Sequence, residues 1–106
     1  MVNKHRGEIA AELGGRQRTL VLTLGALAEL ESAFGADDLV ALTERFGSGR
    51  ASARDLIRII AAGLRGAGEA VSDDEVAVMT VEGSVAGFVR IAAELIAATF
   101  DDGAAR

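Results

Sequence analysis

The chain has 106 residues and a formal net charge of −5, with 50% of its residues apolar and 25% charged. A chain of this length builds one domain around a single core, and the lack of cysteine excludes disulfides, thiolate metal sites and cysteine nucleophiles. We find no apolar stretch of membrane-spanning length and no signal peptide, so we expect a cytoplasmic protein with no membrane partner.

The first predicted element is a β-hairpin. Residues 7–13 alternate, with Ile9, Ala11 and Leu13 on one side, and residues 16–23 alternate in the same way. Between these two stretches, Gly14-Gly15 accepts the positive φ angles of a two-residue hairpin turn. Because two strands alone are marginally stable in water, we expect the hairpin to lay its apolar face on helices.

The side-chain period changes from two residues to a helical spacing after Thr23, which predicts a strand that passes into a helix without a loop. Thr23 is suited to cap the first turn of this helix, and Gly35 is suited to end it in the left-handed conformation. The expected buried face of this helix consists of Leu24, Leu27, Leu30 and Phe34.

Two more helices are predicted in the middle of the chain. The first is short and covers Leu39–Phe46. The second covers residues 53–65, because Ser52 and Asp55 form an acidic variant of the capping box and Gly66 follows the last turn. Its expected buried side chains are Leu56, Ile57, Ile60 and Leu64. Its outer face carries Arg54, Arg58 and Arg65.

The C-terminal part begins with a full capping box, Ser72–Glu75, which opens a short helix with Val76 and Met79 pointing inward. A last helix is predicted from Ser84 to Phe100, with a buried stripe of Val85, Phe88, Ala92, Leu95, Thr99 and Phe100. The predicted fold class is therefore α+β: an N-terminal antiparallel β-hairpin followed by a compact bundle of four to five helices. We expect a single domain over residues 5–100, with loose termini at residues 1–4 and 101–106.

Residues for catalysis or metal binding form no recognisable pattern. The only histidine, His5, lies near the N-terminus, so a histidine-dependent triad has no obvious way to form. The acidic run after Ser72 lacks the alternating carboxylates and the final Glu of a calcium loop. We therefore expect no enzyme activity, no cofactor and no bound metal.

The arginines are concentrated in the middle of an otherwise acidic chain, since residues 45–65 hold five arginines and one acid. Arg54, Arg58 and Arg65 are able to contact phosphate, but no Asn or Gln accompanies them as a base reader. We expect no nucleic-acid partner and favour either a solvated face or a docking face for an acidic protein. Glu31 flanks the apolar stripe as either a hydrogen-bonded rim residue or a partner contact.

The most specific run of the sequence is LTLGALAELE, which leads to Phe34-Gly35. It follows HRGEIAAELGGRQRTLV and precedes DDLVALTERF and SARDLIRIIAAGLRGAGEAVSDDEV. Together these runs, from residue 5 to about residue 100, resemble the gene transfer agent family protein of the phage tail-assembly chaperone type, a family also named for the phage tail tube. The family is encoded in the tail-gene clusters of alphaproteobacterial gene transfer agents and related prophages. The runs are fold motifs, so the resemblance transfers no catalytic residue.

The resemblance implies a role in building a phage-like tail. The leading interpretation is a non-enzymatic chaperone that binds the tape-measure or tail-tube protein, and a structural subunit incorporated into the particle is the alternative. A DNA-binding regulator ranks lower. We expect the partner to bind at the open hairpin edge and the adjoining helix, with the arginines as auxiliary contacts. The same edge could also join copies of this chain into a homo-oligomer. The partner-binding residues expected on this basis are Arg16, Arg18, Glu31, Arg54, Arg58 and Arg65.

Overall fold

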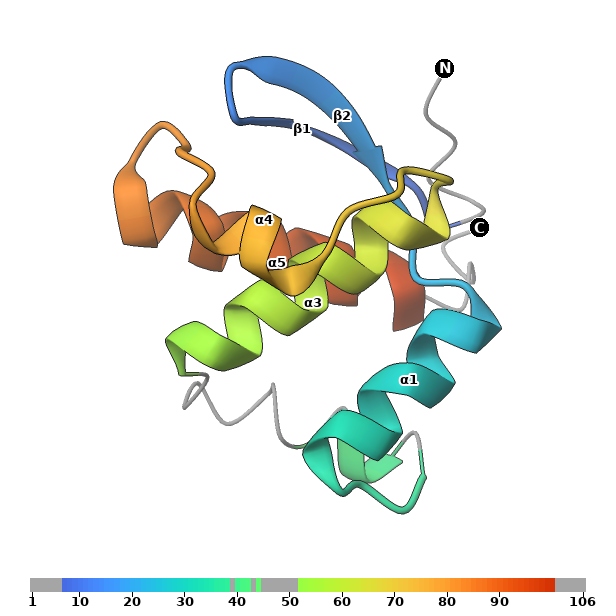
Figure 1. Cartoon of the computed structure of the whole chain (residues 1–106). Helices are drawn as coiled ribbons and strands as arrows, with labels where there is room; N and C mark the ends of the chain where they lie inside the picture. The colour runs from blue at the N-terminus through green and yellow to red at the C-terminus, as the bar shows by residue number, and fades with distance from the viewer. Residues whose placement is uncertain (1–6, 39, 43, 45–51, 101–106) are drawn as a thin grey trace.

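A computed structural model describes residues 7–38, 40–42, 44 and 52–100 and confirms the α+β class (Figure 1). The elements are β1 (Ile9–Leu13), β2 (Arg16–Leu20), α1 (Leu24–Phe34), α3 (Ala53–Gly66), α4 (Asp73–Ala77) and α5 (Ser84–Phe100). Residues 40–42 and 44 are also helical, which places helix where the short Leu39–Phe46 helix was predicted. The two ends of that helix and the expected loose termini lie outside the described residues.

The hairpin forms as its pattern predicts. β1 pairs with β2 in antiparallel orientation, with Leu13 opposite Arg16 and Ile9 opposite Leu20. Gly14 and Gly15 form the turn with φ angles of 63° and 87°, which glycine adopts without steric cost. Along β1, Ile9, Ala11 and Leu13 are buried and the residues between them are exposed, so the hairpin lays one face on the helices.

The second strand is shorter than predicted, and the expected direct passage from strand into helix is wrong. β2 ends at Leu20, and residues 21–23 form a separate link to α1. The backbone N–H of Val21 donates to the carbonyl of Gly63 in α3 at 2.9 Å, so this link bonds to a helix and not to a strand. The alternating side-chain pattern continues through the link, with Leu22 buried, and that is why sequence alone extends the strand.

Helix α1 has both of the expected ends. The Thr23 hydroxyl accepts a hydrogen bond from the N–H of Ala26 at 3.1 Å, and Gly35 takes the left-handed conformation at φ 68°. Leu27 and Leu30 are buried as expected. Phe34 is only half-buried, which contradicts its expected full burial.

Leu24 is 78% exposed, so its predicted place on the buried face of α1 is wrong. At 3.6 residues per turn, Leu24 points about 120° away from Leu30. The core-facing side of this helix is formed instead by Ala26, Leu27 and Leu30.

Helix α3 is the central element of the fold. It packs against α1, β2, α4 and α5, and in Figure 1 it runs through the middle of the molecule with the hairpin above it and α5 behind it. The predicted capping box is present, because Ser52 and Asp55 exchange backbone-to-side-chain hydrogen bonds of 3.1 Å. Leu56, Ile60 and Leu64 are buried as expected, whereas Ile57 is half-buried.

Two glycines let other elements approach the C-terminal half of α3 closely. A Cβ on Gly63 would lie 2.6 Å from a methyl group of Leu95 and 3.2 Å from the Cβ of Leu20. A Cβ on Gly66 would lie only 2.0 Å from the backbone oxygen of Val21. The link between β2 and α1 therefore crosses α3 at a place that no larger residue fits.

The C-terminal helices form where they were predicted, but part of the expected buried stripe of α5 is wrong. The Ser72–Glu75 capping box is present at the start of α4, with Val76 buried behind it. In α5, Ala92 and Leu95 are buried, but Phe88 is half-buried and Val85 is 66% exposed. The buried face of α5 is instead formed around Gly87, Ile91 and Leu95, and Val85 points about 120° away from Ile91. In the part of the chain that the structure describes, no helix is long and apolar enough to cross a membrane.

The crossing at α3 gives a first testable expectation. Gly66→Ala should lower the free energy of unfolding by about 1–3 kcal/mol, because the new methyl group meets a backbone atom that has no rotamer to escape into. Urea denaturation monitored by circular dichroism measures this loss.

The matched control is Gly25→Ala in α1, where a new Cβ would lie 3.9 Å from its nearest neighbour, the Thr23 hydroxyl. There the better helix propensity of alanine should raise stability by about 0.5–1 kcal/mol. If both variants changed stability in the same direction, the close crossing would not be a real constraint.

Candidate partner-binding surfaces

The outward-facing backbone groups of the hairpin follow from its register. In a hairpin with a two-residue turn, the residues that flank the turn form a hydrogen-bonded pair, and the bonded pairs alternate from there. Leu13–Arg16, Ala11–Arg18 and Ile9–Leu20 are therefore the bonded pairs. The N–H and C=O groups of Ala10 and Glu12 point to one outer edge, and those of Gln17 and Thr19 point to the other.

Each edge is closed at one end by the rest of the fold. Next to β1, the N–H of Gly14 donates to the carbonyl of Thr80 at 2.8 Å. Next to β2, the N–H of Val21 donates to Gly63. Between these points, the described residues provide no backbone partner for either edge, and the outer face of the hairpin is exposed at Ala10, Glu12, Gln17 and Thr19. Each edge thus presents two residues to an added strand.

The arginines of β2 bind a single glutamate from the link between α3 and α4. Arg16 lies 3.2 Å from the Glu69 carboxylate, and Arg18 forms an ion pair with the same oxygen. Arg18 also donates from Nε to the Leu13 carbonyl at 2.8 Å. Its side chain is only 10% exposed, against 65% for Arg16, so Arg18 fixes the hairpin to the helical part and Arg16 remains accessible.

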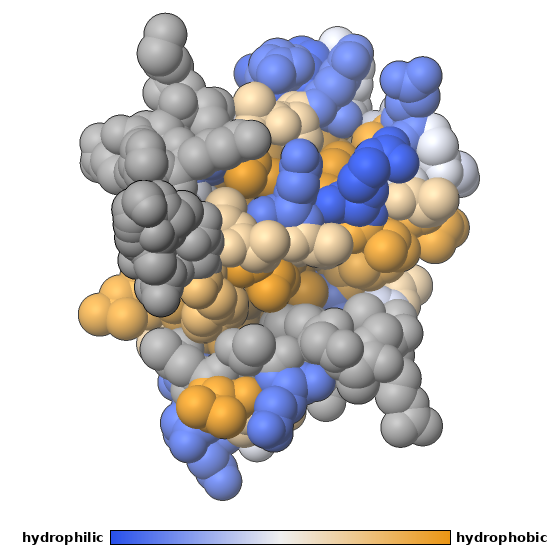
Figure 2. All heavy atoms as spheres, turned by 180° about the vertical axis from the view of Figure 1, so that it is seen from behind, coloured by the Kyte–Doolittle hydropathy of each residue, from blue (hydrophilic) through white to orange (hydrophobic). Residues whose placement is uncertain are grey.

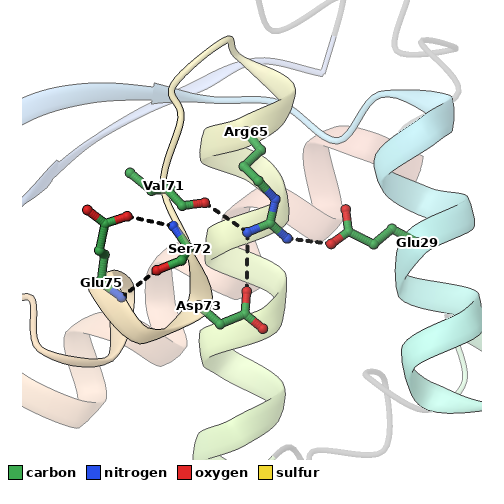
Figure 3. A network of polar contacts seen from close by, with 6 residues as sticks. All are labelled: Glu29, Arg65, Val71, Ser72, Asp73 and Glu75. Atoms are coloured by element: carbon green, nitrogen blue, oxygen red, sulfur yellow. Dashed lines mark hydrogen bonds and ion pairs between the residues drawn. The ribbon is translucent and has the colours of Figure 1, made fainter.

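Arg65 joins three parts of the structure (Figure 3). One nitrogen of its guanidinium, Nη1, donates to the Val71 carbonyl at 3.1 Å and to the Asp73 carboxylate at 3.2 Å. The other, Nη2, forms an ion pair with Glu29 of α1. Arg65 therefore holds α3 against α1 and against the start of α4, where the Ser72 and Glu75 cap is formed.

The other predicted contact residues differ in their accessibility. Arg58 donates to the Ala33 carbonyl at 3.1 Å, and its guanidinium lies 5.7 Å from the centre of the Phe34 ring, a cation–π contact. Arg54 is exposed in the first turn of α3. Glu31 is half-buried, and its backbone carbonyl accepts a hydrogen bond from the N–H of Ala36 at 2.9 Å.

The three arginines of α3 share one face, but this face is not simply solvated. Arg58 and Arg65 cross-link α3 to α1, and both would have to give up internal acceptors to bind a phosphate or an acidic partner. Arg54 is left as the exposed member of the set. This arrangement weakens the DNA-binding interpretation, because phosphate contacts need accessible cations.

Two acids that the sequence analysis did not single out as partners are central to these contacts. Glu69 serves both arginines of β2, and Glu29 serves Arg65. The spacing of Arg16 and Arg18, which places both on one side of a strand, was the available signal for a shared acceptor. No group of three or more metal-ligating side chains occurs among the residues that the structure describes.

Comparison with known proteins gives one finding. A protein-family model described as "Phage tail tube protein, GTA-gp10" matches residues 6–102. No curated protein and no solved structure matches the chain.

The shared glutamate gives a second testable expectation. Glu69→Gln should lower the free energy of unfolding by about 1–3 kcal/mol, because Arg18 loses a charged acceptor in a nearly buried position. Glu12→Gln makes the same chemical change on the exposed outer face of the hairpin and should be close to neutral. Equal urea midpoints for the two variants would show that the Glu69 contacts contribute nothing measurable.

The arginines of α3 give a third. Arg65→Met should reduce stability clearly more than Arg54→Met, because the first leaves Asp73 and the Val71 carbonyl without their donor and the second removes an exposed charge. Thermal melts of both variants under one buffer condition measure the difference. A larger loss for Arg54→Met would contradict the assignment of Arg65 as the cross-link.

Proposed function

Because the chain belongs to the phage tail tube protein family GTA-gp10, we propose that it acts in building the tail of a gene transfer agent, as a non-enzymatic chaperone. Its partner in this proposal is the tape-measure or tail-tube protein, bound before assembly. The family match over residues 6–102 is the observation that carries the assignment to the tail.

The hairpin edges support the chaperone role. A chaperone has to hold a chain that is not yet in its final place, and an added strand is recognised largely through main-chain hydrogen bonds that tolerate different sequences. Each outer edge offers two residues for such bonds, and the exposed Arg16 lies beside the edge of β2. Since Arg58 and Arg65 are used inside the fold, Arg54 is the member of the arginine face best placed to assist.

A structural subunit of the tail is the second candidate, and the description of the family as tail tube proteins favours it. The two candidates differ in where the chain is found after assembly. A chaperone should be present in the producing cell and depleted from purified particles, whereas a subunit should be retained in fixed proportion to the other tail proteins. Quantitative mass spectrometry of lysate and particles separates the two.

The hairpin edge gives a fourth expectation, which is tested by measuring binding to the tape-measure or tail-tube protein. Thr19→Pro removes an outward N–H and adds a ring at the edge of β2 without removing a ladder bond, so binding should be lost while the circular dichroism spectrum is kept. Thr19→Val keeps the N–H at the same position and should bind normally. Glu12→Pro with Glu12→Val tests the edge of β1 in the same way.

The contribution of charge is measured with Arg54→Ala, which should weaken binding only modestly and mainly at low salt. Normal binding by both proline variants, together with loss of binding in Arg54→Ala, would mean that the partner occupies the arginine face and not the hairpin.

A further inference from the structure

The exposed side of α5 carries a continuous apolar sector. Val85 is 66% exposed and Val89 is 48% exposed, and Ala86, Ala93 and Ala97 are exposed on the same side of the helix. Figure 2, which views the molecule from the side of α5, shows apolar residues forming a band across this face. Contiguous apolar surface of this kind marks interaction sites in soluble proteins, whereas single exposed hydrophobic residues do not.

The helical period separates the two sides of α5 clearly. At about 100° per residue, the buried residues Gly87, Ile91 and Leu95 lie within one arc, and the exposed residues fill the opposite half. Within the exposed half, the apolar side chains cover one continuous sector and the small residue Ala93 lies near its middle. Alanine at the middle of a helix face allows a second helix to approach closely.

The charged residues along this sector complement one another. Arg90 and Glu94 are both exposed on one flank of the apolar sector, one turn apart, and neither forms an ion pair with another described residue. Along α5 these are the only charged side chains. The flank thus carries one positive and one negative group, placed symmetrically about Ala92.

We propose that the exposed face of α5 binds the same face of a second copy of this chain, with the two helices antiparallel about a two-fold axis that crosses the contact at the level of Ala92 along the helix. This axis maps each helix onto the other in reverse direction while keeping the flank on the same side. Arg90 of each copy then lies opposite Glu94 of the other, which gives two equivalent ion pairs beside the apolar contact. A parallel pair would instead place the two charged flanks on opposite sides of the contact, where Arg90 of one copy cannot reach Glu94 of the other.

The proposed dimer uses a surface distinct from the hairpin edges, so it does not require the partner that is proposed to bind there. A contact made by one pair of helices is small, so we expect a concentration-dependent equilibrium between monomer and dimer. Sedimentation velocity of the full chain over a concentration series measures it. Ala93→Glu should yield monomer at every concentration, because the two new carboxylates would face each other near the axis.

The charge-swap series tests the orientation. Arg90→Glu alone and Glu94→Arg alone should each weaken the dimer by about tenfold at low salt, since every swap turns two attractive pairs into two repulsive ones. The double variant Arg90→Glu/Glu94→Arg should restore the original dissociation constant. Val78→Glu is the matched control, because Val78 is 81% exposed but lies outside α5.

Circular dichroism melts establish that each variant is folded before it is compared. A chain that stays monomeric over the whole series would overturn the proposal, as would a dimer that Ala93→Glu leaves intact. A dimer that Thr19→Pro dissociates while Ala93→Glu does not would place the contact at the hairpin edge instead. A double variant that is no tighter than the single swaps would reject the antiparallel orientation.

Discussion

The close crossing of the chain over α3 is the contact on which the arrangement of the other elements depends. The link after β2 passes so near to Gly66 that a methyl group would collide with its backbone, and the Val21–Gly63 hydrogen bond fixes the link there. This one crossing places the hairpin over α3 and α5 and directs the chain into α1. A two-stranded hairpin is not stable alone, so its position depends on this support.

Arginine has an internal role in this fold that its placement in the sequence conceals. Three arginines, Arg18, Arg58 and Arg65, donate hydrogen bonds to backbone carbonyls outside their own strand or helix. Their long side chains connect elements across the outside of the small core. The guanidinium group suits this work because its planar donors reach several acceptors at once. The consequence for function is that cationic surface is smaller than the arginine count indicates. Partner recognition therefore depends more on the hairpin backbone and on the apolar side of α5.

Local signals predicted most of the fold. The errors arose where packing against distant parts of the chain decides which side chains are buried or paired. The hairpin turn, the caps at Thr23 and Ser72 and the end at Gly35 depend on a few neighbouring residues, so the sequence contains them. Leu24 and Val85 have helical spacing with buried residues, but the direction of each core is set by what packs on the helix, which spacing alone does not specify. The ion pairs between Glu69 and the arginines of β2 join residues about 50 positions apart in the sequence, and no short-range pattern indicates such a pair.

The two proposed surfaces suit different kinds of contact. The outer face of the hairpin carries side chains that are either small or polar, namely Ala10, Glu12 and Thr19. An added strand would therefore gain main-chain hydrogen bonds but bury little apolar area. Such a contact is modest in affinity and readily released, as a chaperone requires. The α5 face is the reverse, because its valines and alanines gain by leaving water whereas its charges fix the orientation. A permanent tail subunit would have to bury apolar surface against its neighbours, and the exposed apolar sector of α5 is suited to do so. The location of the chain after assembly and the occupant of α5 are therefore linked questions. If the chain is retained in the particle as a subunit, its neighbours in the tail would compete with the second copy for this face. If it is a released chaperone, the second copy would have the face to itself.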